Sequence, residues 1–166
     1  MRILAIDSGL ERTGWAVLEI DKHKFELIGY DCILTYKQHS LVRRCGEIYQ
    51  QLSVIMAKYH PDKIIIEKLF FNINKKTVIN IAQSQGILLV LACQNNIDID
   101  FITPLQIKQI LTGNGRADKT SVRKMVEIEV KLRKSRLLDD TIDAIACGMA
   151  YYYQNRTNRT YKTNNL

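Results

Sequence analysis

The sequence has 166 residues, of which 46% are hydrophobic and 25% are charged, and it contains only two prolines. This composition excludes a disordered chain, and the length predicts a single folded domain whose core needs neither disulfides nor a structural metal. The formal net charge of +7 favours a polyanionic partner such as nucleic acid, and no apolar run approaches the roughly 20 residues that cross a bilayer.

The N-terminal part of the chain predicts three β-strands. Residues 1–7 form a short apolar run that ends in Asp7, and further β-type runs follow at 14–20 and 24–34. The segments between them, SGLERTG and DKHK, have the composition of tight turns. Strands joined by turns this short favour an antiparallel meander.

The middle of the chain predicts a strand between two long helices. Ser40 is a suitable N-cap for an amphipathic helix, which is expected to end near Pro61. The run Lys-Ile-Ile-Ile at 63–66 is typical of a central strand covered on both faces, and it ends at Glu67. A second long helix is predicted at 77–95.

The last part of the chain predicts one more strand and three helices. Thr103 is a suitable N-cap, and Pro104 is a favoured first residue of a helix. The predicted segments are a strand at 97–103, helices at 104–113, 121–132 and 140–154, and a polar, basic tail at 155–166 that is expected to fray.

The order of these elements predicts an α/β fold. Three meander strands, followed by two strands that each come after a helix, give a mixed five-stranded sheet with helices on its faces. In such a sheet the meander is antiparallel and the later strands are parallel. Because no repeat or linker interrupts the pattern, residues 1–154 are predicted to form one domain.

The cysteines indicate a reducing compartment. They are widely spaced and form no CxxC pair, which predicts reduced thiols in a cytoplasmic protein. The N-terminus lacks the layout of a signal peptide, because its apolar run is short and ends in an acid. The three scattered histidines give no spacing for a zinc site. The cysteines are Cys32, Cys45, Cys93 and Cys147.

Acidic side chains stand where ligand sites of α/β proteins form. Asp7 ends the first predicted strand and Glu67 ends the fourth, so both emerge at one edge of the sheet if these strands are parallel neighbours. The stretch LLDDTIDAIACG adds three aspartates at the start of an otherwise apolar helix. Asp143 shares a helix face with Asp140 and also with Asp139. The spacing leaves open which of the tandem pair points inward.

Each of these acids also has an ordinary structural explanation. Asp7 before Ser-Gly is a common turn former, and Glu67 beside a lysine is typical of a solvated strand end. Asp139 and Asp140 suit the N-cap and the first turn of a helix. Asp143 is explained less well, because it lies beyond the first turn in an apolar stretch. Four acids that converge on one end of a sheet therefore predict a site.

A cluster of carboxylates favours a hard cation. Such groups repel one another and raise each other's pKa unless a cation neutralises them. Ligands that are all oxygen atoms suit Mg²⁺ or Mn²⁺. Two such ions, roughly 3.5–4 Å apart, activate a water and stabilise the leaving oxygen when a phosphodiester is cut. A basic chain with this site is predicted to bind and cut a nucleic acid.

Five blocks of the sequence, in this order and spacing, resemble the RuvC-type Holliday-junction resolvases over about residues 1–152. The blocks are AIDSGLERTGWAV, IIIEKLFFNINKKT, AQSQGILL, TPLQIKQILTGNGRADKTSV and DDTIDAIACG. The resemblance implies an RNase H-like fold and a homodimer that nicks four-way DNA junctions symmetrically, with Mg²⁺ as cofactor, in recombination and repair. It also implies a branch-migration motor complex as a possible partner.

The resemblance assigns the acids of the site. The four acids of the family correspond to Asp7, Glu67, Asp140 and Asp143. It therefore selects Asp140 over Asp139, because the last two acids of the family are three residues apart. One neighbouring residue departs from the pattern: Ser8 stands where family members usually carry proline, which loosens the turn without touching the metal chemistry.

The resemblance also assigns residues that contact DNA. The aromatic residue of the family near the junction centre corresponds to Phe70, and its two basic residues near the scissile phosphate correspond to Lys108 and Lys119. Phe70, in a polar loop, is suited to stacking on an unpaired base, and Lys119, in a basic loop, is suited to meeting a phosphate. The alternatives are that Phe70 folds back on the core and that Lys108 lies on a solvated helix face.

Two other functions stay open at this point. One is a broader-specificity RNase H-like nuclease that acts on RNA or on branched DNA in general. The other is a non-catalytic protein that binds branched DNA. The intact acidic quartet disfavours the second, because a pure binder gains nothing from repelling phosphate.

Overall fold

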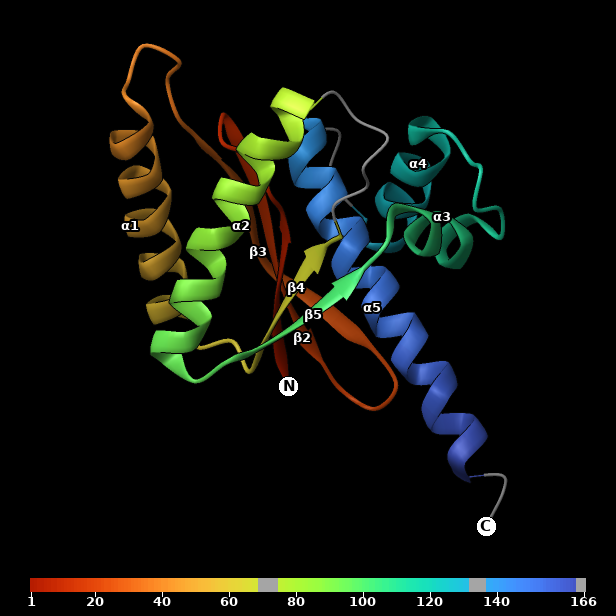
Figure 1. Cartoon of the computed structure of the whole chain (residues 1–166). Coiled ribbons are helices and arrows are strands. Elements are labelled where there is room, and N and C mark those ends of the chain that lie inside the picture. Colours follow the sequence, from red (N-terminus) through yellow and green to blue (C-terminus); the bar gives the residue numbers. More distant parts are fainter. Residues whose placement is uncertain (69–74, 132–136, 164–166) are drawn as a thin grey trace.

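The computed structural model describes residues 1–68, 75–131 and 137–163, which build one sheet with helices on both faces (Figure 1). The strands are β1 (Arg2–Asp7), β2 (Arg12–Ile20), β3 (Phe25–Leu34), β4 (Lys63–Glu67) and β5 (Asp98–Ile102). The helices are α1 (Leu41–Tyr59), α2 (Lys75–Asn95), α3 (Pro104–Thr112), α4 (Lys119–Glu129) and α5 (Asp139–Thr163).

The sheet is mixed, and its strand order is β3-β2-β1-β4-β5. β1, β2 and β3 pair antiparallel, as predicted for the meander. β4 pairs parallel with β1, and β5 pairs parallel with β4. Each of these two strands follows a helix, which lets the chain return in the same direction. The predicted five-stranded mixed sheet is confirmed.

β1 lies at the centre of the sheet and is covered on both faces. Its side chains alternate, so Ile3 and Ala5 pack in one core with α3, α4 and α5, whereas Leu4 and Ile6 pack in a second core with α1 and α2. All four side chains are fully buried. β4 follows the same rule, with Ile65 on the α5 face. Figure 1 shows the two helix groups on opposite sides of the sheet.

The predicted helix ends are present as local capping structures. Ser40 caps α1 by accepting a backbone N–H three residues later, and α1 ends at His60 in the left-handed conformation (φ 47°). Thr103 and Gln106 form a reciprocal capping box at the start of α3. Gly113 ends α3 at φ 73°, a conformation that glycine adopts without strain. These ends are where the sequence patterns predict them.

Helix α5 ends later than predicted. It continues to Thr163, beyond the expected end at Gln154. The chain after Met149 contains neither glycine nor proline, so no residue in it stops a helix that has already started. The predicted boundary between the domain and the tail therefore falls inside α5.

Three other elements, β2, α2 and α4, begin two residues earlier than predicted. For β2, Arg12 and Thr13 already pair with β3. For α4, Asp118 is the N-cap, and its carboxylate accepts the N–H of Ser121 at 2.7 Å. The earlier start of α4 puts Lys119 in the first turn of a helix instead of in a loop.

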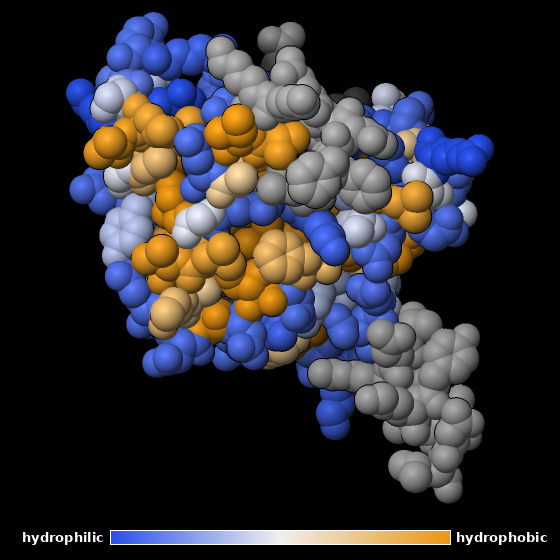
Figure 2. Space-filling view, in the orientation of Figure 1, coloured by the Kyte–Doolittle hydropathy of each residue, from blue (hydrophilic) through white to orange (hydrophobic). Residues whose placement is uncertain are grey.

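The surface carries apolar side chains over α2 and β5, which Figure 2 shows as an orange area. α2 and the edge strand β5 lie side by side. None of the helices in the described ranges combines the length and the apolar character needed to cross a membrane.

Candidate active site

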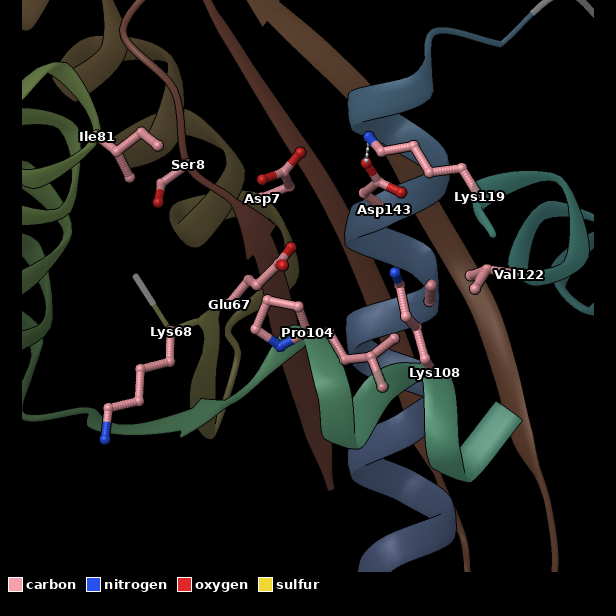
Figure 3. A pocket seen from close by; sticks show the side chains of 12 residues that line it. Asp7, Ser8, Glu67, Lys68, Ile81, Pro104, Lys108, Lys119, Val122 and Asp143 are labelled. Atoms are coloured by element: carbon pink, nitrogen blue, oxygen red, sulfur yellow. Dashed lines mark hydrogen bonds and ion pairs between the residues drawn. The ribbon is translucent and has the colours of Figure 1, made fainter. Parts of the chain in front are cut away.

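The ends of two strands bring Asp7 and Glu67 together. β1 and β4 are parallel neighbours with Ile6 opposite Ile66, so the next residue on each strand, an acid in both cases, stands beside the other. The residues two positions earlier on each strand face α5, and the alternation of side chains puts both carboxylates on that face too. Figure 3 shows the two side chains next to each other at the carboxyl ends of the strands.

Helix α5 brings its aspartates to the same edge. It packs along β1 and β2, and its first turn lies against Gly14, where an added Cβ would overlap the carbonyl group of Asp140. Gly14 is opposite Asp7 in the β1–β2 pairing, so this close approach puts the start of α5 next to the first acid. Further along α5, a Cβ on Gly148 would lie 2.6 Å from a methyl group of Leu18. The two glycines therefore set the distance between α5 and the sheet.

Three of the four predicted acids line one pocket of about 330 Å³. Asp7, Glu67 and Asp143 lie around it together with the predicted Lys108 and Lys119 (Figure 3). Asp140 is not part of the lining. The other lining residues are Ser8, Lys68, Ile81, Pro104, Ile107, Val122 and Ala146.

The tandem aspartates have different partners. Asp139 is exposed and accepts a hydrogen bond from Nη2 of Arg123 at 2.6 Å, which ties the start of α5 to α4. Asp140 is more buried, and its Oδ2 lies 3.3 Å from Nε of Arg12, an ion pair without hydrogen-bond geometry. The charge of Asp140 contributes to raising the pKa of Asp7. Of the two aspartates, Asp140 is therefore the one whose charge acts on Asp7.

Lys119 stands at the α4 side of the pocket. Its Nζ donates a hydrogen bond to Oδ2 of Asp143 at 2.9 Å, and this bond raises the pKa of Lys119. Lys108 lies on α3, and with Lys119 it acts to lower the pKa of Glu67. Both predicted lysines therefore place positive charge beside the acids. Phe70 lies outside the described residues.

The acids make one another's ionisation harder. Burial raises the pKa of Asp7 well above its usual value, and the charges of Glu67, Asp143 and then Asp140 raise it further. Burial and then Asp143 raise the pKa of Glu67 to about 7 despite the nearby lysines. A divalent cation would relieve this repulsion and return both groups to the carboxylate form.

The kind of donor at this edge fits a hard cation. Asp7, Glu67, Asp140 and Asp143 offer only carboxylate oxygens, which suit Mg²⁺ or Mn²⁺. As placed, no three His, Cys, Asp or Glu side chains within the described ranges are close enough to share an ion. Lysine and arginine engage two of the four carboxylates, Asp143 and Asp140.

Two residues of the site are not singled out by the sequence patterns. Arg12 and Gly14 both lie in SGLERTG, which has the composition of an ordinary tight turn. Their roles depend on Asp140, which is far away along the chain. The only local signal is the glycine itself, which often marks a close approach of two backbones when it lies in a strand.

Comparison with known proteins finds relatives over nearly the whole chain. The model of the family "Crossover junction endodeoxyribonuclease RuvC" matches residues 3–151. Proteins of that name from Caldicellulosiruptor saccharolyticus and Fusobacterium nucleatum are 40% identical over 152 residues and 35% identical over 167 residues. These alignments cover 91% and 100% of this chain and 92% and 88% of the relatives.

The fold also matches solved structures. Thermus thermophilus RuvC in complex with Holliday junction substrate superposes with a TM-score of 0.88 at 24% identity. The superposition covers 95% of this chain and 96% of that protein. The likeness confirms the RNase H-like fold class that the resemblance implies.

Proposed function

The chain belongs to the RuvC family of crossover junction endodeoxyribonucleases, and we propose that it resolves four-way (Holliday) DNA junctions by metal-dependent, symmetric, paired nicks. The observation that carries the proposal is one pocket lined by Asp7, Glu67 and Asp143, with Lys108 and Lys119 beside them. The carboxylates suit a metal ion and the lysines suit a phosphate. A single pocket therefore offers both parts of a phosphodiester hydrolase.

The proposed cofactor is Mg²⁺, with two ions per site and Mn²⁺ as a substitute. Asp7, Glu67, Asp140 and Asp143 are the residues that would hold it. Bound divalent ions supply an activated water and stabilise the leaving oxygen. The chain contributes the arrangement of its donors, because strand pairing fixes two of them and α5 brings the other two. With its pKa near 7, Glu67 must release a proton when a cation binds below that pH.

The two lysines are proposed to hold the scissile phosphate. Lys119 is about three-quarters exposed (76%), so its ammonium group is free to turn from Asp143 towards a DNA strand. Lys108 approaches the same pocket from α3. Positive charge on this side offsets the repulsion between the acids and the DNA backbone. Stacking of Phe70 at the junction centre stays a prediction.

A homodimer is proposed to form through α2 and β5. Ile79, Leu89 and Val90 of α2 are 57%, 51% and 51% exposed, and Phe101 of the edge strand β5 is 49% exposed. Figure 2 shows an apolar area over these two elements. Exposed apolar surface of this kind marks an interface. A second copy related by a two-fold axis would cover it and would pair two active sites for the two nicks.

We propose that the enzyme works in the cytoplasm. DNA as the substrate and four cysteines that are all free support a cytoplasmic location. A branch-migration motor as a partner stays a prediction from the resemblance.

The test uses an end-labelled four-way DNA junction with Mg²⁺, wild type beside Asp143→Asn, and a linear duplex as control. We expect paired, symmetric nicks only in the junction and only with the wild type. Tight junction binding without nicks, in both Mg²⁺ and Mn²⁺, would support the non-catalytic binder instead. Equal cleavage of a flap or an RNA duplex would support the broader nuclease.

A further inference from the structure

The two strand-end acids are each paired to an outer neighbour but not to each other. Asp7 is opposite Gly14 of β2, and Glu67 is opposite Ile102 of β5. The register between β1 and β4 ends one residue earlier, at Ile6 and Ile66. The two acids carry like charges when ionised, and repulsion favours moving the strand ends apart. A contact that bridges the two strand ends therefore adds to the ladder in holding their separation.

The side-chain amide of Gln85 supplies such a contact from α2. Its Nε2 donates to Oγ of Ser8 at 3.1 Å and to the backbone carbonyl of Glu67 at 3.0 Å. One amide group thus joins the residue after Asp7 to the backbone of Glu67 itself. The orientation of the amide is fixed by its partner, because a backbone carbonyl only accepts hydrogen bonds.

The contact is buried at the edge of the pocket. Ser8 directly follows the last residue of β1, and its hydroxyl meets Gln85 from α2, whose neighbours Leu88 and Leu91 belong to the core under α1 and α2. Ser8 and Gln85 are 5% and 9% exposed, and water therefore has little access to replace the bonds between them. A buried, satisfied amide holds its partners in one geometry.

We propose that Gln85 is a positioning residue that sets the separation of Asp7 and Glu67 for metal binding. The proposal rests on the proposed function of these acids. The amide is uncharged, so it holds the strand ends in the same way before and after a cation binds. Without it the ends would relax apart, and a cation would have to pull them together at the expense of its affinity.

The variants for the test differ in how much of the contact they remove. Gln85→Met keeps a similar size and removes both donors. Ser8→Ala removes one acceptor and leaves the bond to Glu67. The matched control is Gln94→Met on the same helix, where the amide accepts a hydrogen bond from Tyr49 far from the acids.

The main readout is Mn²⁺ binding without DNA, measured from the free Mn²⁺ signal in electron paramagnetic resonance. Gln85→Met should weaken Mn²⁺ affinity by about tenfold or more, the usual effect of losing a group that orients metal ligands. It should raise the Mg²⁺ concentration for half-maximal junction cleavage by the same factor. Cleavage at saturating Mg²⁺ and junction binding in EDTA should change by less than about threefold. A general loss of structure would instead reduce both.

The remaining variants keep the test decisive. Ser8→Ala should weaken Mn²⁺ binding by a smaller factor, and the double variant should bind no worse than Gln85→Met, because both act on one contact. If Gln85→Met does not fold, unchanged Mn²⁺ affinity in Ser8→Ala overturns the proposal. Wild-type affinity in a folded Gln85→Met, or an equal loss in Gln94→Met, overturns it too. A wild type that binds Mn²⁺ but never nicks a junction refutes the proposed function, while the Mn²⁺ comparison still decides the role of Gln85.

Discussion

Replacing Gly14 with alanine should disable the site while leaving the chain folded. The new Cβ would overlap the carbonyl of Asp140, so the first turn of α5 must recede by about 1.5 Å to reach ordinary contact distance. A displacement of about 1 Å near reacting groups costs about 10²-fold in rate. Crowding in a packed region also costs about 1–3 kcal/mol of stability. We therefore expect single-turnover junction cleavage to fall by about 100-fold or more in a variant that still unfolds cooperatively.

Substitutions at two other glycines show whether cleavage is lost because Asp140 is displaced or because the fold is less stable. Gly148→Ala also crowds α5 but meets the end of the Leu18 side chain, so it should lose stability and keep most of its cleavage. A Cβ on Gly46 in α1 meets nothing within 4 Å, so Gly46→Ala should raise the free energy of unfolding by about 0.5–1 kcal/mol. Combined with Gly14→Ala it should recover part of the loss in the urea midpoint but none of the loss in cleavage. Cleavage by Gly14→Ala within about threefold of wild type would refute this account of how α5 is placed.

Four further predictions concern charge and assembly. In the metal-free protein, Glu67 keeps a proton that the unfolded chain loses, because its pKa rises from 4.5 to about 7 on folding. Stability in EDTA should therefore fall as pH rises through this window, and Glu67→Gln should flatten the decline in urea unfolding. Asp139→Asn should cost at most about 1 kcal/mol and keep cleavage, since its ion pair is exposed. Asp140→Asn should abolish cleavage in the single-turnover junction assay. Loss of cleavage in Asp139→Asn with activity kept in Asp140→Asn would instead assign Asp139 to the site. Arg12→Gln should tighten Mn²⁺ binding in titration calorimetry, because a competing cation leaves Asp140; weaker binding would show that the arginine supports the site instead. Leu89→Lys should give monomers in analytical ultracentrifugation, and an intact dimer would exclude α2 from the interface.

The part of the fold that could be predicted depends on local patterns. A few adjacent residues are enough to predict three kinds of feature: the alternation of the strands, the N-caps at Ser40 and Thr103, and the left-handed glycine after α3. The meeting of Asp7 and Glu67 also follows from such patterns, because both end strands of similar length that turn out to be parallel neighbours. The sheet edge that carries the site could thus be foreseen without long-range information.

The rest depends on contacts between distant segments. Spacing on a helix could not separate Asp139 from Asp140, since that choice is made by Arg123 of α4 on one side and by Arg12 of β2 on the other. Gln85 lies 77 residues from Ser8, and no periodicity in α2 marks it. The late end of α5 was missed for another reason: polar composition predicts exposure, but it does not by itself stop a helix.

The site divides its tasks between uncharged and charged groups. Gly14 and the amide of Gln85 fix where the acids stand, and neither changes with pH, salt or metal. Lys119 and Arg12 balance the charge of two acids, and both contacts compete with any cation or phosphate that arrives. Substitution of Gly14 or Gln85 should therefore weaken metal binding at every salt concentration. The effect of substituting Lys119 or Arg12 on metal binding should instead depend strongly on salt. Burial and then the charge of Asp143 raise the pKa of Glu67, and a divalent ion that binds this edge would offset both effects.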